Sequence, residues 1–224
     1  MAKNPAAKSR RRGRGAAGPE TVTQPVDGGL AELVPDREHS RAWTLLIDGA
    51  PQSHVDLAAP DRLTFSYQRR LGHFADLVAP AGRPLHVVHL GGGAFTLARY
   101  VAATRPRSTQ QIVELDAQLV QLVRRELPLD PGARIRVRST DARAGLAKVP
   151  DDWADLVITD VFDGARTPAH LTSAEFLADV RRVLKAGGGY AANLADGPPD
   201  APVRRPGALH RPARPWRAPR RSRG

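Results

Sequence analysis

Short apolar runs alternate with amphipathic stretches of helical period between residues 85 and 196. This alternation is typical of a parallel sheet whose strands are joined by crossover helices. The sequence therefore predicts an α/β fold with a doubly wound, Rossmann-like sheet. Five strands are expected, over residues 85–90, 111–115, 135–139, 155–161 and 189–195, and helices are expected after residues 91–93 and over residues 116–127 and 174–185.

Local signals predict some of the element boundaries. Thr172 and Glu175 have the spacing of a capping box, which predicts the start of the last helix, and Gly187 predicts its end. Upstream, residues 29–34, 42–49 and 51–57 are expected to form a small N-terminal β-hairpin lid. Residues 63–78 are expected to form the helix that joins this lid to the sheet.

The positive charge is concentrated at the two ends of the chain. Of the formal net charge of +11, residues 1–20 carry +5 and residues 197–224 carry +7, which leaves −1 for residues 21–196. Neither end has apolar periodicity, and arginine-rich arms bind phosphates without a fold, so weak nonspecific contact with nucleic acid is expected there. We expect a disordered basic arm over 1–28, the β-hairpin region over 29–62, a Rossmann-like nucleoside-binding domain over 63–199 and a disordered Arg/Pro-rich tail over 200–224.

Composition excludes several kinds of site. The chain has no cysteine, which excludes disulfides, thiolate metal sites and cysteine nucleophiles. Its histidines show no metal-ligand spacing, so no metal is expected. No apolar run approaches the roughly 20 residues of a membrane-spanning helix, and we expect a cytoplasmic protein without a membrane partner.

Glycines and acidic side chains follow the predicted strands, where ligands bind in open α/β sheets. Glu114 lies 21 residues beyond Gly93, the spacing at which an acidic side chain commonly binds ribose hydroxyls. Thr96 stands at the third glycine place of the dinucleotide fingerprint, which favours a nucleoside such as S-adenosylmethionine or its decarboxylated form. The glycines alone would also fit a plain tight turn. The residues at these strand ends are Gly91, Gly92, Gly93, Glu114, Asp141, Asp160 and Asp163.

Asp160 and Asp163 lie three residues apart on one expected loop. Two such carboxylates can hold an ammonium group and accept its proton, and their repulsion raises the pKa of one of them. The alternative is structural, because aspartate often turns the chain at a strand end.

Six motifs, in order, resemble those of the spermidine synthases (polyamine aminopropyltransferases), particularly spermidine synthase-like proteins of high-GC bacteria. The resemblance covers about residues 29–199 and implies a class I methyltransferase-like fold, with a homodimer as one assembly. It implies transfer of an aminopropyl group from decarboxylated S-adenosylmethionine to putrescine or a related amine, in polyamine biosynthesis. The motifs are LLIDGAPQ (45–52), LTFSYQRRLGHF (63–74), VVHLGGGAFTLAR (87–99), VELDAQLV (113–120), STDARAGL (139–146) and DLVITDVFDGARTPAHL (155–171).

The resemblance also implies roles for individual residues. Asp160 matches the catalytic proton acceptor of the family, and Asp163, Tyr67 and Gln68 match residues that hold the amine. The residues that match contacts to the nucleoside are Gln52, Gly91, Gly92, Gly93, Glu114, Asp141, Ala142 and Pro168.

The sequence departs from the family pattern at three places. Ala94 replaces an aspartate that binds the amine of the donor, and Arg69 replaces a glutamate. A pocket that loses a carboxylate and gains a guanidinium is expected to bind a dication such as putrescine poorly. The resemblance ends near Pro199, so the C-terminal strands of the fold are expected to be missing, and the tail has the composition of GC-rich DNA read out of frame.

These departures keep other functions open. An S-adenosylmethionine-dependent methyltransferase would use the same fold and a related donor. A degenerate, non-catalytic family member and a binding protein that acts through its basic arms are the further alternatives.

Overall fold

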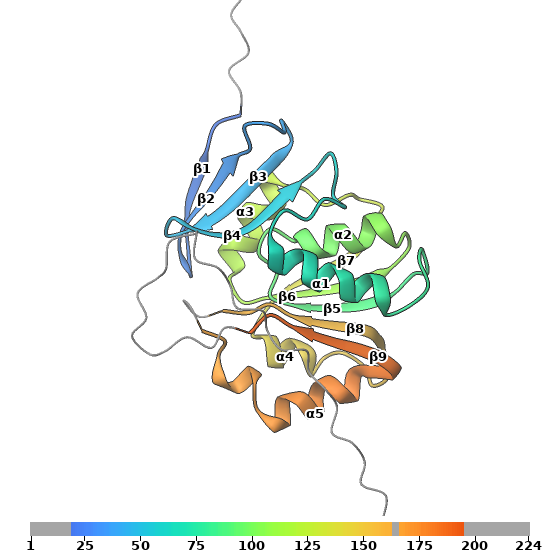
Figure 1. The fold of residues 1–224 in the computed structure, drawn as a ribbon. Coiled ribbons are helices and arrows are strands. Elements are labelled where there is room, and N and C mark those ends of the chain that lie inside the picture. The colour runs from blue at the N-terminus through green and yellow to red at the C-terminus, as the bar shows by residue number, and fades with distance from the viewer. Residues whose placement is uncertain (1–18, 163–165, 195–224) are drawn as a thin grey trace, which may run out of the picture.

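The computed structural model of the chain describes residues 19–162 and 166–194, which form a parallel sheet and an antiparallel sheet (Figure 1). The parallel sheet has the order β7-β6-β5-β8-β9, so the strand order reverses between β5 and β8. The prediction of a doubly wound sheet is therefore confirmed. Its strands are β5 (His86–Leu90), β6 (Thr109–Glu114), β7 (Arg134–Ser139), β8 (Ala154–Thr159) and β9 (Leu184–Ala192).

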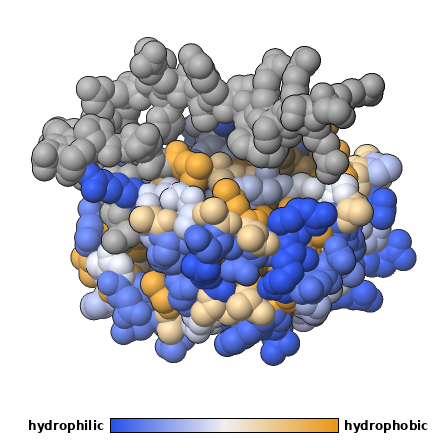
Figure 2. Space-filling view, turned by 90° about the horizontal axis from the view of Figure 1, so that it is seen from below, coloured by the Kyte–Doolittle hydropathy of each residue, from blue (hydrophilic) through white to orange (hydrophobic). Residues whose placement is uncertain are grey.

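Helices cover both faces of this sheet, which explains why its central strands are nearly continuous apolar runs. α1 (Ser66–Leu77), α2 (Thr96–Thr104) and α3 (Ala117–Glu126) pack on one face. α4 (Ala142–Leu146) and α5 (Ala174–Val183) pack on the other, next to the short 3-10 helix η1 (Ala169–Leu171). Figure 2 looks onto the α5 side, where hydrophobic side chains form small patches among hydrophilic ones.

The antiparallel sheet has four strands rather than the three of the expected hairpin lid. They are β1 (Val22–Val26), β2 (Gly29–Pro35), β3 (Ala42–Ile47) and β4 (Ala50–Asp56), paired in that order. The expectation that residues 1–28 are disordered is thus wrong for β1. This strand pairs with β2 through a tight turn, and it buries Val26 in the cluster that α3 also joins.

The last helix begins at Ala174 as predicted, but its predicted cap and its predicted end are wrong. The side chain of Ser173, not that of Thr172, caps α5 by accepting a hydrogen bond from Phe176 N at 3.2 Å. Thr172 instead donates to the carbonyl of Ala169. α5 ends at Val183 because Leu184 already pairs with Ala154 of β8, and Gly187 lies within β9.

Residues 1–18, 163–165 and 195–224 lie outside the described part of the chain. The expectations about the rest of the basic arm, the tail and the missing C-terminal strands depend on these residues. Within the described part, β7 and β9 are the outer strands of the parallel sheet. None of the helices in the described ranges is long and apolar enough to cross a membrane.

Candidate functional site

A cleft of about 960 Å³ lies at the carboxyl ends of the central parallel strands, and β3 and β4 contribute to its walls. It is the place where the reversal of strand order predicts a ligand. The cleft brings together every described residue that the sequence predicts for a site, and Asp163 lies outside the described residues. These lining residues are Gln52, Tyr67, Gln68, Gly91, Gly92, Gly93, Glu114, Asp141, Ala142, Asp160 and Pro168.

The glycine turn after β5 lies directly against the end of β8. Gly91 has φ +89°, and a Cβ atom placed on it would lie 2.1 Å from the carbonyl oxygen of Asp160. Only glycine fits such a close approach in this backbone region. The turn therefore brings the start of α2 and the end of β8 to the same side of the cleft.

Glu114 binds the backbone of this turn from the end of β6. Its Oε2 accepts hydrogen bonds from Gly92 N at 2.8 Å and Gly93 N at 3.3 Å, and its Oε1 accepts one from Asp116 N at 3.1 Å. The carboxylate lines the cleft, and its remaining lone pairs can accept further bonds. It can thus hold hydroxyl groups of a ligand while it fixes the turn.

Asp160 is a carboxyl group with a high proton affinity. Burial raises its pKa from 3.8 to about 6, and the negative charge of Glu114 adds to this rise. A hydrogen bond from Asn193 Nδ2 to Asp160 Oδ1, 2.9 Å long, acts in the opposite direction and holds the carboxyl group in place. A carboxylate with such a pKa can accept a proton from a bound group near neutral pH.

Tyr67 and Gln68 reach the cleft from the first turn of α1. The hydroxyl of Tyr67 donates to the carbonyl of Gln52 at 2.5 Å and accepts from Gln68 Nε2 at 3.4 Å. Burial and the nearby charge of Asp160 raise the pKa of Tyr67, so its phenol stays neutral. Gln68 is buried, and its Oε1 has no hydrogen-bond partner among the described residues, which leaves an acceptor for a donor group of a ligand.

Asp141 closes another part of the cleft at the start of α4. Its Oδ1 accepts from Arg143 N at 2.9 Å and Ala144 N at 3.0 Å, and its Oδ2 lies 3.1 Å from His170 Nε2. Burial acts to raise the pKa of Asp141, but these hydrogen bonds outweigh burial and lower it. Asp141 is therefore ionised and fixed, next to Ala142 and facing η1, which Pro168 caps.

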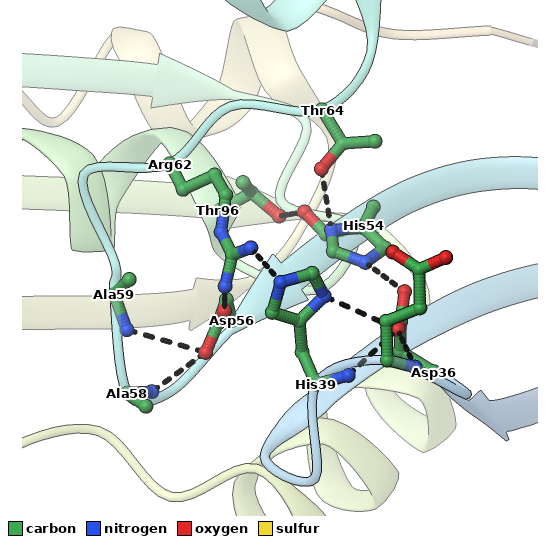
Figure 3. Close-up of polar contacts among 10 residues, drawn as sticks. Asp36, His39, His54, Asp56, Ala58, Ala59, Arg62, Thr64 and Thr96 are labelled. Carbon is green, nitrogen blue, oxygen red and sulfur yellow. Dashed lines mark hydrogen bonds and ion pairs between the residues drawn. The ribbon is translucent and has the colours of Figure 1, made fainter.

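The antiparallel sheet holds the glycine turn from the other side. Ser53 Oγ accepts a hydrogen bond from Ala94 N at 3.1 Å, and the carbonyl of His54 accepts one from Thr96 Oγ1 at 3.0 Å. Figure 3 shows the polar network around His54, whose ring lies between Asp36 and Thr64. The network anchors β4, and β4 in turn positions the start of α2.

The network continues from His54 toward the loop before α1. His39 contacts both Asp36 and Arg62, and Arg62 forms an ion pair with Asp56 (Figure 3). Within residues 19–162 and 166–194, no group of three or more His, Asp or Glu side chains has an arrangement that could hold a metal ion. The side chains of the network bind one another.

Several polar lining residues were not predicted for the site from the sequence, among them Ser53, His89, His170 and Asn193. Asn193 follows the last parallel strand, so the rule that selected Asp160 could have found it. His89 lies in the middle of β5, and its ring bonds Gln110 at 2.8 Å. Burial lowers the pKa of His89 to about 4, which keeps its ring neutral.

The expected guanidinium in the amine pocket is not found. Arg69 is exposed, does not line the cleft, and donates from Nη1 to the carbonyls of Leu63 and Thr64. These bonds hold the side chain against the loop that precedes α1. The replacement at position 69 therefore adds no positive charge to the wall of the cleft.

Comparison with known proteins gives consistent matches. Residues 64–193 match the spermine/spermidine synthase domain family. The polyamine aminopropyltransferase of Neisseria meningitidis serogroup A (strain Z2491) is 26% identical over 176 residues, which cover 78% of this chain and 65% of the relative. Polyamine aminopropyltransferase 2 of Streptomyces coelicolor is 34% identical over 168 residues, which cover 69% of this chain and 29% of the relative.

Solved structures show the same likeness. The crystal structure of a probable spermidine synthase from Corynebacterium glutamicum has a TM-score of 0.71 and 37% identity, and the match covers 79% of this chain and 64% of that one. Spermidine synthase from Thermotoga maritima shares the fold, with a TM-score of 0.58 and 20% identity over 77% of this chain and 56% of that one. The chain thus spans between 29% and 65% of the length of these four proteins.

Proposed function

The chain belongs to the spermine/spermidine synthase family, and we propose from this premise that it transfers an aminopropyl group from decarboxylated S-adenosylmethionine to an amine. The observation that carries the proposal is Asp160, whose pKa of about 6 suits a base that takes a proton from an amine near neutral pH. It lines the same cleft as Glu114 and Asp141.

The cleft fits a nucleoside donor in size and in chemistry. Its volume of about 960 Å³ is within the range of small-molecule and cofactor sites. In the proposal, Glu114 accepts hydrogen bonds from the ribose hydroxyls. Gln52, Asp141, Ala142 and Pro168 surround the remainder of the nucleoside, and the three glycines let the backbone approach it closely.

The proposed transfer joins two changes in bonding. The amine attacks the carbon next to the sulfonium, so a C–N bond forms as a C–S bond breaks and methylthioadenosine leaves with the electron pair on sulfur. The amine loses a proton, which Asp160 accepts. A carboxylate that both orients the amine and removes its proton contributes proximity and base catalysis together.

The proposed amine site lies in the part of the cleft that α1 lines with Tyr67 and Gln68. There Gln68 Oε1 offers a buried acceptor without a partner among the described residues, and Tyr67 presents a neutral phenol. Both suit an ammonium or amine donor group, and we assign Asp163 to the same site by its match to the family pattern. Putrescine or a related amine is the proposed acceptor.

The test supplies the full chain with decarboxylated S-adenosylmethionine and a panel of mono-, di- and triamines, and detects methylthioadenosine and the extended amine by mass spectrometry. We expect both products in equal amounts with at least one amine. A parallel reaction with S-adenosylmethionine tests the methyltransferase alternative. A methylated product there, without turnover of the decarboxylated donor, contradicts the proposal.

A further inference from the structure

Three arginines lie on one face of β7, an outer strand of the parallel sheet. Arg134, Arg136 and Arg138 alternate along this strand with Ile135 and Val137. Successive residues of a strand point to opposite faces, and both apolar residues pack into the cluster that α3 joins. The arginines therefore project from the opposite face of the sheet.

Neither α4 nor α5, the α-helices that the structure describes on that face, packs closely over these arginines. α4 packs on β5 and β6, and α5 packs on β9 (Figure 1). A shallow hollow of about 360 Å³ lies over β7 and the start of β6. Thr109, Gln111 and the three arginines are among the residues that line it. The ladder pairs Thr109 with Arg134 and Gln111 with Arg136, so these four side chains share the face.

The polar groups of this hollow lack partners in the described part of the chain. None of the three arginines forms an ion pair there. Arg138 Nε and Gln111 Oε1 are buried without any hydrogen-bond partner, and Gln111 as a whole is only 8% exposed. A buried donor without a partner is costly, so the Nε of Arg138 indicates that an acceptor group completes the hollow.

We propose that this hollow binds an anion with several phosphate groups in a row, that is, an oligophosphate. Alternate residues of a strand are about 6.6 Å apart, so the guanidinium groups form a line of regularly spaced, fork-shaped donors. Guanidinium groups bind phosphate oxygens in pairs of hydrogen bonds. The hydroxyl of Thr109 and the Nε2 amide group of Gln111 add hydrogen-bond donors beside this line.

Charge and composition of the hollow favour this occupant over others. The two ends of the chain are strongly basic, so they do not complement a hollow lined by arginines. A second copy paired through β7 would place arginines against arginines. Among residues 19–162 and 166–194, no aromatic side chain lines the hollow, so this part of the chain offers no platform on which nucleic-acid bases could stack. An anion without bases fits better.

The test is calorimetric titration of the full chain with sodium tripolyphosphate at fixed ionic strength. The variant Arg134→Gln/Arg136→Gln/Arg138→Gln should bind at least tenfold more weakly than the native chain. The control variant Arg37→Gln/Arg41→Gln/Arg124→Gln removes the same charge from exposed positions elsewhere and should bind within about twofold of the native chain.

Several results would overturn the proposal. Equal weakening in both triple variants would assign binding to overall charge, and absence of binding by the native chain would leave the arginines as protection of an edge strand against pairing. Tighter binding of a mixed-sequence single-stranded oligonucleotide than of tripolyphosphate would favour nucleic acid instead. Thermal unfolding monitors the fold of each variant.

A milder variant covers the case in which the triple variant fails to fold. Arg136→Lys keeps the charge and loses the fork, and should weaken binding about threefold without changing the unfolding temperature. Unchanged binding in this variant, together with a triple variant that does not fold, would count against the proposed recognition. None of these measurements depends on transferase activity.

Discussion

At the scale of single residues, the neighbours of Asp160 set the pKa of this carboxyl group in the cleft. Burial and Glu114 raise its pKa, whereas Asn193 lowers it. Because the folded pKa of about 6 exceeds the ordinary 3.8, ionisation of Asp160 opposes folding. This destabilisation is absent below about pH 4 and complete above about pH 6, the range in which the carboxylate becomes the proposed base.

Asp160→Asn should therefore separate activity from stability. The proposed turnover should fall about 10²- to 10⁴-fold, the usual contribution of a general base. At pH 7 the free energy of unfolding should stay the same or rise by about 1–2 kcal/mol, because a buried charge is removed. Steady-state kinetics and urea unfolding measure the two effects, and a variant that keeps native turnover contradicts the assigned role.

The two neighbours of Asp160 should shift the pH profile in opposite directions. Asn193→Ala removes the hydrogen bond that lowers the pKa of Asp160, so the acidic limb of kcat/KM for the amine should move to higher pH. Glu114→Gln removes a negative charge, so the limb should move to lower pH when the donor is saturating. Shifts of the same sign in both variants would show that another group controls the limb.

At the scale of elements, the glycine turn after β5 couples two strands and a helix. Gly91→Ala should strain the backbone at φ +89° and drive Cβ into the carbonyl of Asp160. Gly82→Ala is the matched control, because Gly82 also has a positive φ, of +73°, but no atom within 4 Å of its added Cβ. The control should lose about 1–2 kcal/mol of unfolding free energy and Gly91→Ala clearly more. Equal losses in urea unfolding would mean that the close approach does not matter.

The elements also show what a sequence can predict. The central parallel strands β5 and β8 could be predicted because apolar runs are buried between two layers of helices, and β7 because its apolar residues alternate with arginines. β1 was missed because Thr23, Gln24 and Pro25 separate its two valines, so this five-residue segment beside a basic arm has no apolar alternation. The cap of α5 was assigned one residue early because Thr172 and Ser173 both suit a cap, and only the turn of η1 decides between them.

The candidate site could be predicted where its residues follow parallel strands, because ligands of open α/β sheets bind at the carboxyl ends of these strands. Glu114, Asp141 and Asp160 follow parallel strands and meet in one cleft. Ser53 and His170 reach that cleft from an antiparallel strand and a 3-10 helix, whose positions depend on contacts that are distant in the sequence. The orientation of Arg69 could not be predicted either, because it depends on the carbonyls of Leu63 and Thr64, which accept its hydrogen bonds.

At the scale of the whole molecule, hydrogen bonds join the antiparallel sheet to the start of α2, beside a hydrophobic cluster that the two sheets share. Ser53 and His54 of β4 accept hydrogen bonds from Ala94 N and Thr96 Oγ1 at the start of α2. Ser53 is only 5% exposed, and removing its hydroxyl would leave a buried N–H without a partner.

Ser53→Ala should weaken this joint. The free energy of unfolding should fall by about 1–3 kcal/mol, and amide hydrogen exchange should quicken in β4 and around Ala94 together. Ser40→Ala, at an exposed position of the β2–β3 loop, is the control. Faster exchange in β4 alone would mean that the two sheets move independently there.

Because both sheets supply walls of the cleft, any ligand that binds there contacts parts of the chain that separate when the protein unfolds. The unfolding temperature should then increase with the logarithm of ligand concentration. A dye-based melting screen of nucleosides and polyamines, added singly and in pairs, would rank them by affinity without a catalytic assay. A pair that stabilises the protein by more than the sum of its members would identify donor and acceptor at once.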